Sequence, residues 1–186
     1  MQYVFIGGIP ASGKSHLARK IAKTTGARHV EIDTWRDEMA VDPKLKYWVD
    51  FFWNLDEEKY WRTATCDEQW KNIQKQSEAF WPTILKRIKE TQKTGEPAIF
   101  EGVNILPYLA SRDLDFGGVF LLGESFEEIF ERNKREPRWG KTEELQRKEA
   151  EAFYGCERLM YKNESEKYGF KTFTNPLEAE NALLNP

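Results

Sequence analysis

The 186-residue chain is poor in cysteine and histidine, with two residues of each. Cys66 and Cys156 are far apart and form no C-x-x-C pair, so we expect no zinc site or disulfide framework and predict two reduced thiols. No apolar run approaches the length of a membrane span or resembles a signal peptide, and the net charge of −3 disfavours a dedicated nucleic-acid binder. Repeats and low-complexity linkers are also lacking. We therefore expect one soluble, cytoplasmic domain over residues 1–186, with no membrane or nucleic-acid partner.

The chain does contain a glycine-rich phosphate-binding motif. Residues 8–15 read Gly-Ile-Pro-Ala-Ser-Gly-Lys-Ser, which fits G-x-x-x-x-G-K-[ST], and they follow an apolar run that starts at Tyr3. Such a turn lets many backbone N–H groups converge on a phosphate chain. The spacing predicts bound ATP, with Lys14 as a catalytic residue that reaches the β- and γ-phosphates and the Ser15 hydroxyl on Mg²⁺. The residues expected to bind the nucleotide here are Gly8, Pro10, Ala11, Ser12, Gly13, Lys14, Ser15 and His16.

Five short strand candidates alternate with helical stretches, which predicts an α/β fold of three layers with a parallel sheet. The first, third and fourth strands are nearly all apolar, as expected for central strands, whereas the second and fifth carry polar residues and belong at the edges. Right-handed crossovers then favour the order 2-3-1-4-5. The expected strands are Tyr3–Ile6, His29–Ile32, Ala98–Phe100, Val119–Leu122 and Lys171–Phe173.

Asp33 lies at the carboxyl end of the second strand, the end at which open parallel sheets bind ligands. Phosphoryl transfer needs a carboxylate that accepts the proton of the attacking hydroxyl. We therefore predict that Asp33 is a catalytic base and binds the substrate, with Arg36 as a further substrate contact. The alternative is that Asp33 only caps the helix that starts near Thr34.

The third strand ends in Glu101 and Gly102, which the predicted strand order places beside the phosphate loop. An acid at this position helps to hold Mg²⁺ or its waters in P-loop enzymes. We therefore predict that Glu101 is a metal ligand and that both residues contact the substrate. The alternative for Glu101 is a surface glutamate at a strand end.

A helical insertion rich in aromatic residues, residues 41–95, separates the second strand from the third. Its later part shows an apolar stripe typical of a core helix, with Pro82 marking a kink or a fresh start. The earlier aromatic cluster is predicted to line an acceptor pocket, to stack on a ring or to form a dimer face, and core packing explains it equally well. The tryptophans of the insertion are Trp48, Trp53, Trp61, Trp70 and Trp81.

A charged helical hairpin follows the fourth strand. The run Ser125–Glu128 reads as a capping box, Pro137 ends the helix, and Thr142 starts the next one. We predict a closing lid over residues 132–142, because arginine side chains match the equatorial oxygens of the transition state. A solvated charged helix is the alternative. The predicted catalytic residues of the lid are Arg132, Arg135 and Arg138.

Asn175 follows the last expected strand, in a loop that we expect to pass near the phosphate loop. This position predicts a contact with the nucleotide base. The polar turn formed by Asn175 and Pro176 explains the same residues equally well.

Taken with these motifs, the chain resembles the small P-loop kinases of the nucleoside-monophosphate-kinase-like group. That group includes adenylate, shikimate and gluconate kinases, antibiotic phosphotransferases and zeta-toxin-like proteins. The stretch Ile99–Pro107 is most similar to 2-phosphoglycerate-kinase-like proteins. The T-x-G-style loop with an arginine, typical of adenylate kinases, is absent after Asp33, which speaks against a nucleotide acceptor.

The resemblance implies an enzyme that uses ATP and Mg²⁺ to phosphorylate a hydroxyl or phosphate of a small-molecule acceptor, as a monomer or homodimer. Two other functions remain open. One is a zeta-toxin-like kinase of sugar-nucleotides. The other is a nucleotide-operated regulatory ATPase that has no acceptor.

Overall fold

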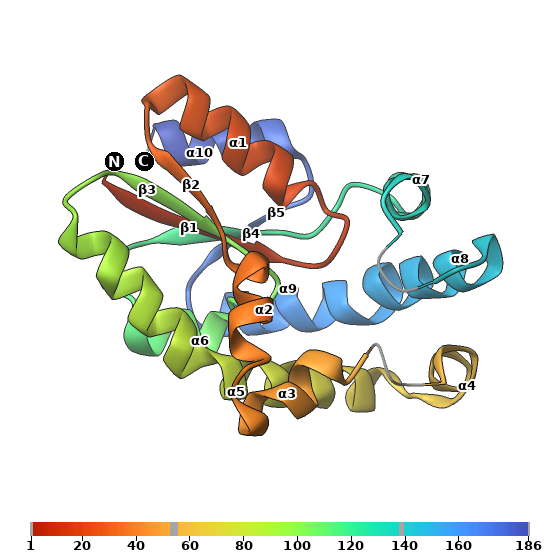
Figure 1. Cartoon of the computed structure of the whole chain (residues 1–186). Coiled ribbons are helices and arrows are strands. Elements are labelled where there is room, and N and C mark those ends of the chain that lie inside the picture. The colour runs from red at the N-terminus through yellow and green to blue at the C-terminus, as the bar shows by residue number, and fades with distance from the viewer. Residues whose placement is uncertain (1, 53–55, 138–139, 186) are drawn as a thin grey trace.

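The structure is a computed structural model that describes residues 2–52, 56–137 and 140–185. Five parallel strands form one sheet in the order β2-β3-β1-β4-β5 (Figure 1). The predicted α/β fold and strand order are therefore confirmed, and the two polar strands lie at the edges. The strands are β1 (Tyr3–Gly8), β2 (Arg28–Glu31), β3 (Ala98–Glu101), β4 (Gly118–Leu121) and β5 (Lys171–Phe173).

Helices cover both faces of the sheet. Helices α1 and α10 pack on one face, and α5, α6 and α9 lie on the other (Figure 1). Within the described ranges, no helix is both long and apolar enough to cross a membrane. The bounds of these helices are α1 (Lys14–Thr25), α5 (Cys66–Lys93), α6 (Pro107–Asp113), α9 (Arg158–Lys167) and α10 (Pro176–Leu184).

The alternation of side chains along the strands produces two apolar cores. Phe5, Phe100 and Phe120 are fully buried in the core that includes α5, α6 and α9. Val4 and Ile6 belong to the other core, where they pack with the apolar stripe of α1. Because the central strands contribute to both cores, they must be apolar on both faces.

The insertion between β2 and β3 begins with a 3₁₀ turn, Ile32–Trp35, and four helices follow in its described residues. A capping box of Thr65 and Glu68 starts α5, and this helix continues through Pro82. The interpretation of Pro82 as a fresh start is therefore wrong. The apolar stripe of α5 is core, as predicted. The helices that precede α5 are α2 (Arg36–Met39), α3 (Pro43–Asp50) and α4 (Glu57–Thr63).

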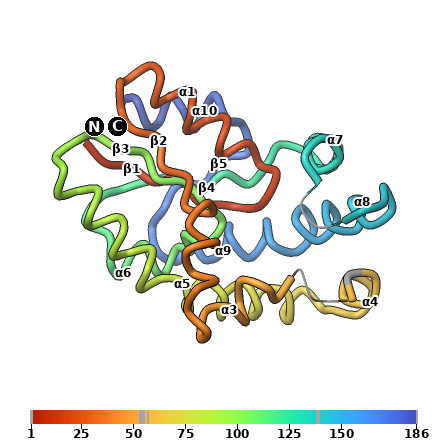
Figure 2. Tube along the Cα trace, in the orientation of Figure 1, coloured from red at the N-terminus to blue at the C-terminus, as the bar shows by residue number. Residues whose placement is uncertain are grey.

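Two helices on the carboxyl side of β4 form the predicted hairpin, α7 (Phe126–Arg135) and α8 (Glu143–Ala152). The hydroxyls of Ser125 and Thr142 cap their N-termini, as the sequence predicts. A π-helical turn, Phe153–Glu157, then joins α8 to α9. The tube in Figure 2 shows that α8 and α9 follow one another along a single long axis.

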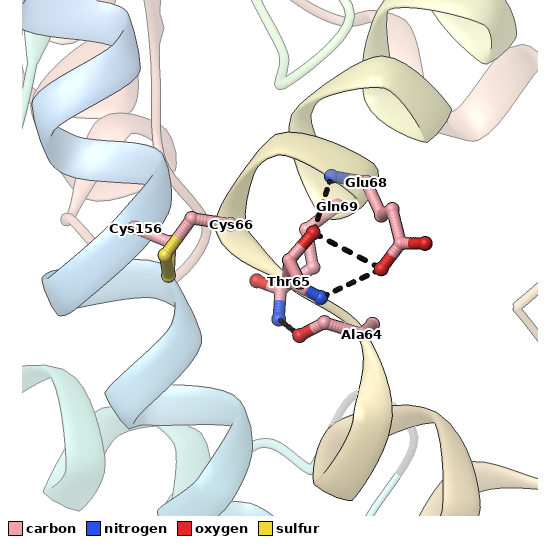
Figure 3. Close-up of a disulfide and its surroundings, with 6 residues drawn as sticks. All are labelled: Ala64, Thr65, Cys66, Glu68, Gln69 and Cys156. Atoms are coloured by element: carbon pink, nitrogen blue, oxygen red, sulfur yellow. Dashed lines mark hydrogen bonds between the residues drawn. A yellow bond between two sulfur atoms is a disulfide. The ribbon is translucent and has the colours of Figure 1, made fainter.

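A disulfide bond joins Cys66 to Cys156 (Figure 3). Cys66 is the first residue of α5, Cys156 lies in the π-helical turn, and their Cα atoms are 5.1 Å apart. The prediction of two reduced thiols is wrong. The two cysteines are 90 residues apart in sequence, so no local pattern reveals that they are neighbours. The packing of α5 against the π-helical turn brings them together.

We expect the Cys66→Ser, Cys156→Ser double variant to lose about 2–4 kcal/mol of unfolding free energy, because the crosslink closes a long loop and so restricts the unfolded chain. Urea denaturation followed by tryptophan fluorescence measures this loss. Reductant should destabilise the wild type by a similar amount and leave the double variant unchanged. Equal stability of the two proteins without reductant would contradict the expectation.

Candidate functional site

The phosphate loop connects β1 to α1 at the carboxyl edge of the sheet. Gly8 has a φ of 123°, and a Cβ there would lie 2.1 Å from the Leu121 carbonyl oxygen. Gly13, which precedes α1, has a φ of 95°. Side chains are therefore excluded at Gly8 by backbone contact and strained at both positions. The loop also directs the positive N-terminal end of the α1 dipole toward its concave side, as anion-binding loops do.

Two side chains of the loop converge on one carbonyl group. Lys14 Nζ donates to the Ile9 carbonyl oxygen at 2.6 Å, and Ser12 Oγ donates to the same oxygen at 2.8 Å. Lys14 is only 5% exposed. Its ammonium is thus held inside the loop, where a triphosphate would meet it as a concentrated positive charge.

A cavity of about 660 Å³ lies between the phosphate loop and α7. Arg132 spans it, since Nη1 donates to the Ala11 carbonyl oxygen at 3.3 Å and Nη2 lies 3.1 Å from Glu128 Oε2. Arg135 lines the same cavity and is exposed, whereas Arg138 lies outside the described residues. The predicted nucleotide-binding residues that line this cavity are Ala11, Gly13, Lys14, Ser15 and His16.

A buried polar network ties Gly140 and α7 to α8. Glu149 is fully buried on α8 and accepts from the Gly140 N–H at 2.6 Å and from Asn133 Nδ2 at 2.7 Å. Gln146 Nε2 donates to the Gly140 carbonyl oxygen at 2.9 Å. Because Asn133 adjoins Arg132 on α7, this network holds the arginine beside the phosphate loop.

Asn175 lies at the start of α10, where its Oδ1 accepts from the Leu177 N–H at 2.8 Å. This bond is the ordinary turn and cap interaction that the sequence also allows. The neighbouring residue, Pro176, lines the same cavity as Arg132. The structure thus uses the Asn175 side chain as a helix cap next to the cavity.

A second cavity, of about 400 Å³, lies between the phosphate loop and the helical insertion. Phe52, Tyr60 and Trp61 line it, so part of the aromatic cluster borders a pocket, as one of the interpretations predicts. Trp48, Trp70 and Trp81 pack on or within the core instead, and Trp53 lies outside the described residues. The aromatic insertion therefore serves both pocket and packing. Predicted site residues on the cavity wall are Pro10, Lys14, Ser15, Asp33, Arg36 and Glu101.

Asp33 lies in the 3₁₀ turn after β2, on the wall of this second cavity. Neither the turn nor α2 has a side-chain cap, so the interpretation of Asp33 as a helix cap is wrong. Arg36 Nη2 lies 3.9 Å from Asp33 Oδ1 and donates to Asn104 Oδ1 at 3.3 Å. A Cβ at Gly102 would lie 3.4 Å from Asp33 Oδ1, which places the carboxylate against the end of β3.

Glu101 is buried at the end of β3 with only 2% of its surface exposed, so the interpretation as a surface glutamate is wrong. Burial raises the pKa of its carboxyl, but the contact with His29, the charge of Lys14 and the Ser15 hydroxyl together outweigh burial and lower that pKa below the usual value. Glu101 therefore lies beside Lys14 and Ser15 of the phosphate loop.

Sequence reasoning missed several residues of the second cavity. Gln69, Gln76, Glu157 and Tyr161 line it from α5, the π-helical turn and α9. Asn104 is buried and supports Arg36, while its Nδ2 donates to Ser77 Oγ at 2.9 Å. The one available signal was polar residues interrupting otherwise apolar helix faces. That signal does not say which cavity such residues border.

No protein-family model matches the chain, and a search of curated proteins returns no match. Solved structures do match it over nearly the whole length. Shikimate kinase from Acinetobacter baumannii in complex with shikimate has a TM-score of 0.55 and 10% identity, covering 99% of this chain and 91% of that one. Deoxyadenosine kinase from M. mycoides with bound dATP has a TM-score of 0.53 and 16% identity, covering 100% and 98%.

Likeness at this level of identity bears on the fold. Together with the parallel order β2-β3-β1-β4-β5 and the loop from β1 to α1, it confirms the resemblance inferred from the sequence. The chain therefore has the fold of the P-loop kinases of the nucleoside-monophosphate-kinase-like group.

Proposed function

We propose that this chain transfers the γ-phosphoryl group of ATP to a hydroxyl or phosphate of a small molecule. The observation that carries this proposal is that two cavities meet at the phosphate loop. Lys14, Ser15, Arg19 and Glu136 line both of them. A nucleotide in the lid-side cavity would thus present its terminal phosphate to an acceptor in the aromatic-walled cavity, the arrangement that in-line transfer requires.

The residues divide into three roles in this proposal. Lys14 and the loop N–H groups hold the β- and γ-phosphates and stabilise charge that develops on their oxygens. Asp33 accepts the proton of the attacking hydroxyl, and Arg36, held by Asn104, orients the acceptor. Arg132 contacts the phosphates when the lid closes, since it already lies against the loop at Ala11.

Ser15 and Glu101 fit a Mg²⁺ ion, because they combine a hydroxyl at the start of α1 with a buried carboxylate of lowered pKa. When bound there, Mg²⁺ would neutralise phosphate charge. The role of the protein is to hold both oxygens in place. His29 and Lys14 do so for Glu101 through their interactions with its carboxylate.

A thermal-shift screen of small metabolites tests the proposal. We expect an acceptor to raise the melting temperature more in the presence of a non-hydrolysable ATP analogue than without it. The same compound should take up label from γ-labelled ATP. Hydrolysis unaffected by every metabolite, with nucleotide-dependent binding of a protein partner, would favour the regulatory ATPase instead. Growth arrest on expression would favour the zeta-toxin-like kinase.

Arg132→Ala is expected to lower kcat by tenfold or more, which corresponds to about 1.4 kcal/mol. The KM for ATP should change little, because the arginine gains its phosphate contacts in the closed complex. Arg132→Lys should restore little activity, since an ammonium lacks the planar fork of a guanidinium. Steady-state kinetics measures these effects.

Arg135→Ala and Arg138→Ala belong in the same kinetic series, because we predict the lid to act through at least one of the three arginines. Lys134→Ala on the same helix is the matched control, since Lys134 pairs with Glu131. Near-wild-type kcat in all three arginine variants would show that α7 and α8 form only a solvated hairpin.

A further inference from the structure

We propose that His29, Glu31 and Glu101 form a binding site for a divalent transition cation of the Zn²⁺ class. One nitrogen and two carboxylate oxygens from these residues all lie within 4.8 Å of one another. The strand register explains this arrangement, because Glu31 pairs with Glu101 across β2 and β3. His29 is two residues before Glu31 and so shares its face of β2. The sheet therefore positions all three side chains.

The spacing of His29 and Glu101 suits two ligands of one ion. His29 Nε2 lies 3.4 Å from Glu101 Oε1. Two atoms at Zn²⁺ bond lengths on a tetrahedral ion are about 3.3–3.4 Å apart. Both atoms are buried, and neither has a hydrogen-bond partner in the described part of the chain. An unsatisfied oxygen on a carboxylate that is 98% buried carries a large desolvation cost, and a cation at this point would relieve it.

Local charge also favours a cation beside these strands. The carboxylates of Glu31, Asp33 and Glu101 all lie on the wall of the second cavity at this edge of the sheet. Lys14 and Arg19 offset part of that charge, since Lys14 acts on Glu101 and Arg19 acts on Glu31. A bound divalent cation would compensate the remainder.

The ligand set separates this site from the Mg²⁺ position proposed at Ser15 and Glu101. Imidazole nitrogen favours Zn²⁺ and its first-row neighbours, whereas Mg²⁺ prefers oxygen ligands alone. Glu101 contributes to both positions, and the two oxygens of its carboxylate allow this. The inference does not depend on catalysis, because the pairing of β2 with β3 positions the three side chains.

Titration calorimetry with Zn²⁺ on the nucleotide-free, Mg²⁺-free protein tests the site. His29→Gln and Glu31→Gln should each weaken Zn²⁺ binding at least about tenfold, because loss of a direct ligand costs no less than loss of an outer-shell partner. His16→Gln is the matched control. It removes the other histidine of the chain, which is exposed on α1, and should leave Zn²⁺ affinity unchanged.

Nitrogen-15 spectra of the imidazole rings provide a second measurement that needs no variant. Zn²⁺ should shift the Nε2 resonance of His29 and leave His16 unaffected. Equal Zn²⁺ affinity of the wild type and His29→Gln, or a shift confined to His16, would overturn the proposal. His29 and Glu101 would then form only an ion pair. Both measurements use nucleotide-free protein, so a negative result for Zn²⁺ does not bear on the proposed kinase function. In the same way, absence of phosphoryl transfer does not bear on the metal site.

Discussion

Lys14→Ala should lower the rate of phosphoryl transfer by at least about 10²–10³-fold. This is the loss expected when one preorganised donor that stabilises charge in the transition state is removed. ATP affinity should fall by about tenfold or more, because a charge-assisted hydrogen bond to phosphate contributes roughly 1.5–3 kcal/mol. The fold should survive, since this ammonium donates to a carbonyl oxygen of its own loop, that of Ile9. Nucleotide titration of the folded variant measures the affinity.

Lys23→Ala is the matched control for Lys14→Ala. It removes an exposed lysine from the last turn of the same helix, far from the loop. We expect wild-type affinity and turnover in this control. Unchanged ATP affinity in a folded Lys14→Ala protein would falsify the assignment of the phosphate loop.

Asp33→Asn should lower the rate of transfer to the true acceptor by about 10²–10⁴-fold, the range expected when a general base is lost. ATP binding should be nearly unchanged, because Asp33 lines the second cavity and does not line the nucleotide cavity. The amide keeps the shape of the carboxylate but cannot accept the proton. Single-turnover kinetics with saturating ATP isolates this step from binding.

Asp37→Asn tests whether any carboxylate near the start of α2 has the same effect. Asp37 is exposed on that helix and should tolerate the change. If Asp33→Asn instead lowers thermal stability and keeps its turnover, then Asp33 has a structural role and the proposed base is wrong.

Much of the phosphate loop and of the α7–α8 hairpin was predictable because local sequence sets the backbone of both. The glycines of the phosphate loop report backbone conformations that other residues rarely adopt, as the positive φ angles of Gly8 and Gly13 show. The caps at Ser125 and Thr142 likewise bound the lid helices within a few residues. The position of Arg132 on α7 was predictable because the cap at Ser125 sets where that helix begins.

The acceptor side was less predictable. Asp33 and Arg36 were found through their place at the end of β2, which strand order relates to the site. The pairing of Glu31 with Glu101 depends on the register of β2 and β3. Glu157 and Tyr161 come from segments more than a hundred residues later, so no local pattern ties them to this cavity.

The sequence by itself determined the phosphate-loop motif, the strand order and the starts of α7 and α8. Each of these depends on local backbone demands or on whether a strand is buried on one face or two. Only the tertiary structure decided the bond between Cys66 and Cys156, the walls of the second cavity and the convergence of His29 with Glu101. These features depend on distances between segments that are far apart in the chain. Two things set those distances: the packing of α5 against the segment from α8 to α9, and the register of β2 on β3.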